Sequence, residues 1–129
     1  MHYPPDFKYT KEHEWIKANG TAATIGITHH AQESLGDIVF VELPKVGAEI
    51  TAGKTFGTVE SVKAVSDLFA PASGTVTEVN AELNKSPENI NHDAHSAWMI
   101  KIALKAPGEL DGLMSASDYE KFVAEEGGH

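Results

Sequence analysis

A single lysine lies at the centre of the segment whose residue types are best suited to chemistry. Small apolar side chains flank Lys63 and polar ones follow three residues away; these neighbours are Val62, Ala64, Glu60 and Ser66. Two strands that meet at such a centre would form a tight hairpin with the Lys63 amine exposed at its tip. The four-carbon stem of the lysine can then serve as the base of an arm. Acylation of the amine would remove its charge and leave a neutral tether.

The seven histidines raise the question of a metal site. His29 and His30 are adjacent, and His92 and His95 have the spacing of metal ligands, with Asp93 between them. A bound metal needs three or four converging ligands and further residues that orient them, and the sequence shows neither. We therefore expect ordinary histidines in surface loops and predict no metal site.

Three kinds of catalytic site are excluded by the sequence. The chain has no cysteine, which excludes thiol nucleophiles, disulfides and thiolate metal sites. The segment Gly53-Lys54-Thr55 is similar to the end of a phosphate-binding loop, but Ala48 stands where that loop requires glycine, so a β-turn is the better interpretation. No serine lies in a G-x-S-x-G turn. None of these three patterns therefore indicates a catalytic site.

Length and charge limit the class of protein further. The 129 residues are enough for one domain and too few for two, so we expect a single domain over residues 1–129. The formal charge is -9, and all ten basic residues are lysines. Nucleic-acid binding and binding to anionic membranes both need a basic surface, which this composition does not supply. The first residues lack the pattern of a leader segment, which predicts a cytoplasmic protein, or a mitochondrial matrix protein if a leader has been removed.

Short strands and tight turns dominate the predicted secondary structure. Residues rich in β-branched and aromatic side chains predict strands at 22–28, 37–43 and 98–104, and Asn19-Gly20 predicts a hairpin that leads into the first of these. Four-residue turns separate further short strands. This regular spacing favours a mainly β fold, a small barrel or sandwich with short helices added. We expect the aromatic residues of these strands to lie in the core: Trp15, Phe40, Phe56, Phe69 and Trp98.

Three helical segments are predicted beside the strands, after an extended lead-in at 1–12. A helix is expected between a capping Thr28 and a terminating Gly36. A single helical turn is expected at 86–89, capped by Ser86. The C-terminal helix is expected near 116–126 with a capping box that begins at Ser117. Its apolar face consists of Tyr119, Phe122 and Val123.

A lysine at a surface turn is usually only solvated, so the residues around Lys63 must decide its role. The sequence Glu60-Ser61-Val62-Lys63-Ala64, followed by Ser66-Asp67, closely resembles the lipoyl-attachment motif of glycine cleavage system H proteins. The resemblance continues in order over nearly the whole chain. It includes Lys11-Glu12-His13-Glu14-Trp15, Gly26-Ile27-Thr28, Ala31-Gln32, Leu35-Gly36, Phe40-Val41-Glu42-Leu43-Pro44, Pro71, Ser73-Gly74, Val79-Asn80, Pro87, Ile90-Asn91, Trp98 and Tyr119.

Two other kinds of carrier fit the motif less well. Biotin carriers usually place methionine beside the modified lysine, where this chain has Val62 and Ala64. Lipoyl domains of 2-oxoacid dehydrogenase complexes usually have Asp-Lys-Ala and belong to long multidomain chains. The resemblance to H proteins therefore implies a barrel–sandwich hybrid of the kind found in lipoyl and biotinyl carriers, with a hairpin centred on residue 63.

The resemblance also implies a non-catalytic shuttle. Lipoate would be attached to Lys63 as N6-lipoyllysine by a lipoate-attaching enzyme that recognises the hairpin through Glu60, Ser61, Val62 and Ala64. The arm would take an aminomethyl group from a pyridoxal-phosphate glycine decarboxylase to a tetrahydrofolate-dependent aminomethyltransferase. A dihydrolipoyl dehydrogenase would then reoxidise the dithiol. The carrier is expected to act as a monomer.

A carrier of this kind should shelter its loaded arm from water, since the aminomethyl intermediate is labile. The resemblance suggests Glu14 and Asp67 as acceptors for the charged amine; alternatively, both are ordinary surface acids. Glu12 and residues 92–97 depart from the family pattern. They are the only hints of an alternative function, a relay that donates its lipoyl group to other lipoate-dependent enzymes without serving glycine cleavage.

Overall fold

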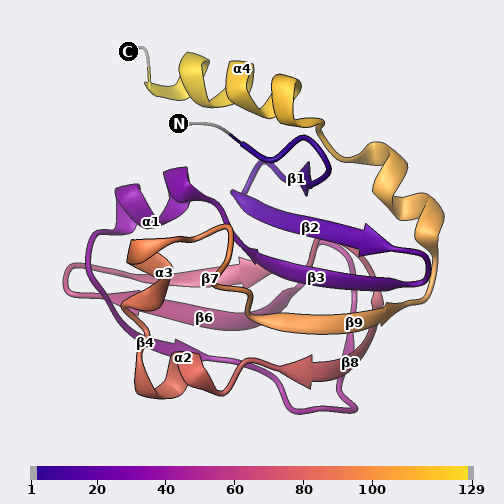
Figure 1. Ribbon diagram of the computed structural model, residues 1–129, viewed down its shortest axis with the longest axis horizontal. Coiled ribbons are helices and arrows are strands. Elements are labelled where there is room, and N and C mark those ends of the chain that lie inside the picture. Colours follow the sequence, from indigo (N-terminus) through magenta and orange to yellow (C-terminus); the bar gives the residue numbers. More distant parts are fainter. Residues whose placement is uncertain (1–2, 128–129) are drawn as a thin grey trace.

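Two antiparallel β-sheets enclose the main core of the structure, a computed structural model that describes residues 3–127 (Figure 1). The strands are β1 (Lys8–Tyr9), β2 (Glu14–Asn19), β3 (Ala22–Ile27), β4 (Ile38–Glu42), β5 (Glu49–Ile50), β6 (Thr55–Ser61), β7 (Val65–Phe69), β8 (Gly74–Val79) and β9 (Ile100–Leu104). The larger sheet has the order β1-β2-β3-β9-β8-β5, and the smaller one has the order β4-β6-β7. The predicted mainly β architecture is confirmed.

Short helices cover the ends of the sheets. They are α1 (His29–Leu35), α2 (Glu82–Lys85), α3 (Asn89–His92), the 3₁₀-helix η1 (Pro107–Gly112) and α4 (Ala116–Gly127). Figure 1 shows α1 near the end of the β6–β7 hairpin and α4 lying over β1, across the molecule from α2 and β8. As predicted, Thr28 caps α1 through its Oγ1, which accepts the Ala31 N–H at 3.2 Å, and Gly36 ends the helix at a φ of 83°.

The side chains of β2 divide the interior into two clusters. Ile16 packs into the aliphatic cluster between the sheets, and Trp15 packs into an aromatic cluster beneath α4, because successive strand residues point to opposite faces. The aromatic cluster consists of Tyr3, Phe7, Tyr9, Trp15, Ala116 and Tyr119. Gly26 pairs with Trp15, and a Cβ on this glycine would lie only 2.6 Å from the Trp15 ring. Only glycine fits at that position.

The helix boundaries near residue 86 and at α4 differ from the prediction. The Ser86 N–H donates to the Glu82 carbonyl at 2.8 Å, so Ser86 ends the unpredicted helix α2, and the next helix begins only at residue 89. The cap of α4 is Ser115, whose Oγ accepts the Asp118 N–H at 3.2 Å, whereas Ser117 lies within the helix. A serine followed three residues later by an acidic residue occurs both at Ser115 and at Ser117. The sequence pattern alone therefore could not decide which serine caps the helix.

Phe40 does not belong to the core. Its side chain is 51% exposed, because the pairing of β4 with β6 shifts between Ile38 and Phe40. This irregularity turns both Val39 and Phe40 outward, while Ile38 and Val41 face the interior. Phe69 and Trp98 are half-buried rather than fully enclosed. The N-terminal segment also does more than predicted, since Tyr3, Phe7 and Tyr9 are all buried in the aromatic cluster.

Candidate functional site

The β6–β7 hairpin presents Lys63 in a three-residue turn at residues 62–64. The side chain of Lys63 is exposed, as predicted. Within residues 3–127, the lysines that form ion pairs are Lys17 and Lys101, so the amine of Lys63 has no carboxylate partner there. An exposed amine without such a partner is accessible to an acylating enzyme.

Ser61 organises this turn from within. Its side chain is buried, and its Oγ accepts the N–H groups of Lys63 at 3.3 Å and Ala64 at 3.1 Å. The hydroxyl also donates to the Ala64 carbonyl at 3.3 Å, and the Ser61 N–H donates to the same carbonyl at 2.8 Å. Such serine-to-backbone bonds fix tight turns. The orientation of the Lys63 backbone therefore depends directly on Ser61.

The end of α1 supports the hairpin tip. The N–H of Val62 donates to the carbonyl of Asp37 at 3.0 Å. Lys63 extends past Gly36, where an added Cβ would lie 3.6 Å from the Lys63 Cε. The stem of the lysine therefore rests beside the backbone of the α1–β4 connection, which gives the arm a defined starting direction.

Asn91 of α3 holds the α1–β4 connection in place. Its Nδ2 donates to the Gln32 Oε1 and to the Gly36 carbonyl, both at 2.9 Å. Its Oδ1 accepts the Ile38 N–H at 2.8 Å. These partners lie 53 to 59 residues away in the chain, so no local sequence pattern could have assigned this role to Asn91.

Exposed apolar side chains surround the hairpin tip. Val62 and Val65 are 69% and 66% exposed, and Val39 and Phe40 are about half exposed on the neighbouring strand β4. Glu60 pairs with both Phe40 and Val65 across the sheet and is itself exposed, as is Ala64. A surface of this kind is typical of a contact site for other proteins.

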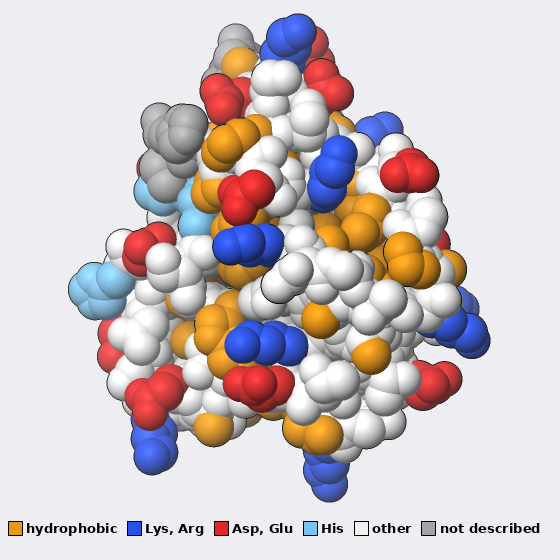
Figure 2. Space-filling model, turned by 45° about the vertical axis from the view of Figure 1, so that its right-hand side comes forward, with side chains coloured by type: hydrophobic (Ala, Val, Ile, Leu, Met, Phe, Trp, Pro, Cys, Tyr) orange, Lys and Arg blue, Asp and Glu red, His pale blue; other side chains and the backbone are white. Residues whose placement is uncertain are grey.

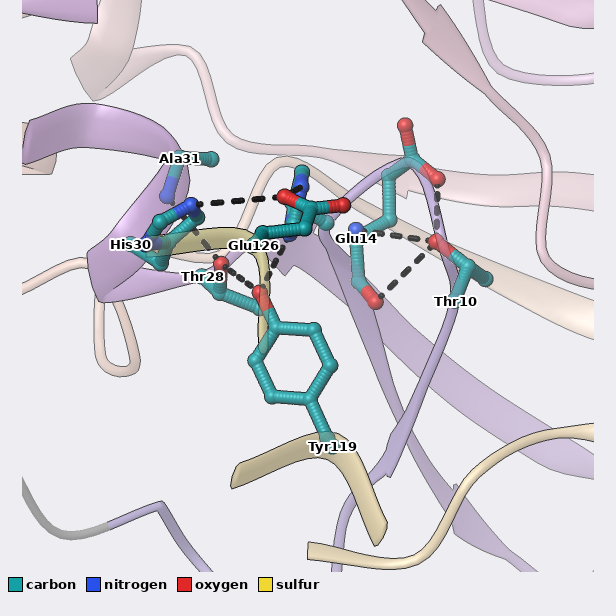
Figure 3. A network of polar contacts seen from close by, with 8 residues as sticks. Thr10, Glu14, Thr28, His30, Ala31, Tyr119 and Glu126 are labelled. Atoms are coloured by element: carbon teal, nitrogen blue, oxygen red, sulfur yellow. Dashed lines mark hydrogen bonds and ion pairs between the residues drawn. The ribbon is translucent and has the colours of Figure 1, made fainter. Parts of the chain in front are cut away.

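Glu14 is a buried carboxylic acid and not an ordinary surface acid. Its side chain is 1% exposed, and its Oε1 accepts from the Thr10 hydroxyl at 2.6 Å (Figure 3). Its Oε2 accepts the Phe69 N–H at 3.2 Å. Burial raises the pKa of Glu14 to about 7, although both hydrogen bonds oppose the rise. The carboxyl can therefore gain or lose a proton near neutral pH.

Asp67 lies on the same edge strand that Glu14 contacts. The strand β7 is the edge of the smaller sheet, and the Glu14 carboxylate satisfies its outward Phe69 N–H. Asp67 is exposed on β7, four residues after Lys63 and two before Phe69. Val65, Asp67 and Phe69 share one face of the strand because side chains alternate. Glu14 lies at the free edge of β7, at the end of the strand farther from Lys63.

A hollow of about 500 Å³ opens beside Thr10, the hydrogen-bond partner of the buried Glu14. It is bounded by the loop that contains Thr10 and Glu12, by Ala70 and Pro71 after β7, and by Met114 before α4. Thr10 therefore belongs both to this hollow and to the hydrogen bonds of Glu14. The exposed Glu12, which departs from the family pattern, also lines the hollow. The sequence did not suggest a role for Thr10.

The histidines singled out in the sequence do not form a joint metal site. His92 is exposed, and Asp93 accepts from the Ser96 hydroxyl at 3.0 Å. His95 is not an ordinary surface residue, because its ring packs against Tyr3 and its Nε2 accepts the His29 N–H at 3.3 Å. Burial lowers the pKa of His95. The divergent segment 92–97 thus contributes packing to the aromatic cluster.

Comparison with known proteins identifies the family. The family model described as "Glycine cleavage H-protein" matches residues 7–126. The chain belongs to the glycine cleavage H-protein family. The glycine cleavage system H proteins of Koribacter versatilis and Acidobacterium capsulatum are 70% and 61% identical to it over 129 residues, the full length of each chain. A crystal structure of a glycine cleavage system H protein from Mycobacterium marinum superposes with a TM-score of 0.86 at 41% identity, covering 98% of this chain and all of that one.

Membership in the H-protein family confirms two predictions made from the sequence. The fold is that of H proteins, and the chain is a lipoyl carrier component of the glycine cleavage system rather than an enzyme. H proteins typically carry lipoate, and the relatives named here are bacterial. Among residues 3–127, no helix is both long and apolar enough to cross a membrane.

Proposed function

We propose that lipoate is attached through an amide bond to Nζ of Lys63, and that the arm serves the glycine decarboxylase, the aminomethyltransferase and dihydrolipoyl dehydrogenase in turn. The observation that carries this proposal is the position of Lys63, exposed at the tip of a turn fixed by Ser61 and supported at Gly36. Bound lipoate would supply a disulfide that accepts the aminomethyl group and is later regenerated from the dithiol. The cytoplasmic location, the monomeric state and the single-domain organisation stay predictions.

The residues around Lys63 fit a tethered arm. The amine attacks an activated lipoyl acyl donor, the amide forms, and the amine loses a proton as the leaving group departs. Glu60, Val62 and Ala64 are exposed beside the lysine, where the attaching enzyme can contact them, whereas the buried Ser61 holds the turn. A rigid turn presents the amine in one position and lowers the entropic cost of docking.

The edge strand β7 gives the arm a path from Lys63 toward Glu14. Asp67 lies midway along the strand, the Glu14 carboxyl contacts its far end at Phe69, and Thr10, which donates to Glu14, lines the hollow of about 500 Å³. A carboxylate there can accept hydrogen bonds from a charged aminomethyl group. Because burial holds the Glu14 pKa near 7, the cation of the loaded arm would also favour the ionised form of this acid.

A tryptic mass spectrum tests the attachment. Protein made with lipoate and an attaching enzyme should give one peptide from residue 55 to 85 that carries the mass of one lipoyl group, because trypsin does not cut after an acylated lysine. Lys63→Arg should lose the modification, while Lys54→Arg, which changes a nearby exposed lysine, should keep it. Complete cutting after Lys63, with a control carrier modified in parallel, would contradict the proposal.

A second assay separates the shuttle from the relay. The lipoylated protein is mixed with a glycine decarboxylase, and exchange of labelled carbon dioxide into glycine is followed. We expect exchange that depends on Lys63. A lipoylated protein that supports no exchange, yet donates its lipoyl group to other lipoate-dependent enzymes, would favour the relay.

A further inference from the structure

Two histidines and a glutamate converge where three segments of the chain meet. His13 lies in the loop before β2, His30 in the first turn of α1, and Glu126 near the end of α4. The Glu126 Oε1 is 3.2 Å from the His13 Nε2. It is 3.9 Å from the His30 Nε2 (Figure 3). One ligand atom from each residue lies within 4.8 Å of the other two. The sequence did not predict this cluster, since its members come from distant parts of the chain.

His13 is held in a fixed orientation by buried partners. Its backbone has a φ of 72°, the left-handed region that few non-glycine residues adopt. Its Nδ1 lies 2.7 Å from the hydroxyl of Tyr119, and that hydroxyl lies 2.7 Å from the Thr28 Oγ1. Tyr119 and Thr28 are both fully buried. A polar partner on one ring nitrogen that directs the other nitrogen outward is the usual support of a metal-binding histidine.

We propose that His13, His30 and Glu126 bind a divalent transition-metal ion, with Zn²⁺ as the best fit. Two nitrogen ligands and one carboxylate oxygen match a common zinc ligand set, in which water takes the fourth position. Ligands about 2.1 Å from a tetrahedral centre lie about 3.4 Å from one another. The distance from His13 to Glu126 already meets this requirement, and His30 needs to move about half an ångström closer to the Glu126 oxygen.

A solvent-accessible approach reaches the cluster at His30. A hollow of about 420 Å³ adjoins His30 and is bounded by Glu33 and Glu120 as well as by Val123. These carboxylates make the approach negative, which favours a cation. Figure 2 shows histidine side chains together at one side of the drawn face. The bound ion would join the end of α4 to α1 and to the loop that leads into Glu14.

Zinc binding can be measured on the whole protein after treatment with a chelator. We expect calorimetry with Zn²⁺ to show one site, and Co²⁺ to give the absorption spectrum of a tetrahedral complex. His30→Gln and Glu126→Gln each remove one ligand and should weaken binding at least tenfold, which corresponds to about 1.4 kcal/mol. Both residues are partly or fully exposed, so we expect the variants to fold. Their melting temperatures without metal check this.

Two controls locate the site. His29→Gln changes the adjacent histidine on α1, whose Nε2 faces Glu33 at 3.5 Å, and should leave the affinity within about twofold. A double substitution, His2→Gln with His129→Gln, removes the histidines outside the described residues. Equal affinity in all variants, or a loss confined to either control, would overturn the proposal. Absence of Zn²⁺ binding to the unmodified sequence would overturn it as well.

Discussion

At the scale of single residues, Glu14 links the chemistry of the site to the stability of the fold. Its carboxyl group is buried, accepts from Thr10, and satisfies the edge-strand N–H of Phe69. A carboxyl in such surroundings is more stable as the neutral acid, because ionisation costs solvation that two hydrogen bonds only partly replace. Keeping Glu14 buried beside β7 therefore lowers the stability of the folded protein near neutral pH, where the carboxyl ionises.

The pKa of Glu14, about 7 in the folded protein against an ordinary 4.5, predicts a pH dependence of stability. The folded state binds the proton more tightly than the unfolded state, so the contribution of Glu14 is fully present below pH 4.5 and is lost as the pH rises through about 7. Between these limits we expect the free energy of unfolding to fall by up to roughly 3 kcal/mol relative to Glu14→Gln.

Urea unfolding of both proteins from pH 4.5 to 8 checks this difference. Glu60→Gln, which changes an exposed carboxylate of β6, serves as the control and should follow the unmodified protein at every pH. A constant difference between the unmodified protein and Glu14→Gln over this range would show that Glu14 ionises equally in the folded and unfolded states.

At the scale of elements, the β6–β7 hairpin depends on supports from both within and outside. From within, the Ser61 Oγ accepts two N–H groups of the turn. From outside, the carbonyl of Asp37 in the α1–β4 connection accepts the Val62 N–H, and Asn91 holds this connection in place. Neighbouring helices therefore fix the element that carries Lys63. This arrangement explains how an exposed three-residue turn can present a lysine in one orientation.

Ser61→Ala is expected to loosen the turn without unfolding the sheet. The substitution removes the acceptor for the N–H groups of Lys63 and Ala64, which solvent then replaces at a cost of about 1 kcal/mol. We expect lower NMR order parameters at residues 62–64 and slower attachment of lipoate by several-fold. Ser66→Ala, on the opposite strand, is the control. Unchanged order parameters in Ser61→Ala would refute the role of this hydroxyl.

At the scale of the whole molecule, α4 closes the aromatic cluster over the larger sheet. Tyr119 is fully buried, its ring stacks on Tyr9 at a centroid distance of 4.7 Å, and its hydroxyl contacts both His13 and Thr28. One side chain thus connects the C-terminal helix to the N-terminal strand, to the loop before Glu14 and to the start of α1. On the face drawn in Figure 2, charged side chains of both signs are interspersed.

Tyr119→Ala is expected to lower the free energy of unfolding by about 4 kcal/mol, because it leaves a cavity in a packed aromatic cluster. Tyr119→Phe keeps the ring and loses only the hydroxyl contacts, so it should cost about 1 to 2 kcal/mol. Chemical denaturation measures both values, and hydrogen exchange along α4 shows whether the helix detaches. Equal losses in the two variants would mean that the hydroxyl contacts, and not the packing, hold α4.

The sequence by itself determined the local elements and the lysine. The Thr28 cap, the Gly36 terminus and the Asn19-Gly20 turn act over a few residues, so their effects can be predicted from neighbouring residue types. The segment from Glu60 to Ala64 likewise identifies Lys63 and the family from neighbouring residue types alone. The boundary at Ser117 was wrong because Ser115 offers an equally good cap, and the one at Ser86 was wrong because Ser86 ends α2 instead of beginning a helix.

Only the tertiary structure decided which side chains meet and which are buried. The bulge in β4 exposes Phe40, and the approach of β2 to the edge of β7 buries Glu14 and raises its pKa. Asn91 and the cluster of His13, His30 and Glu126 join residues that lie far apart in the chain. Long-range contacts and desolvation depend on how the sheets and helices pack, and no pattern of neighbouring residues contains that information.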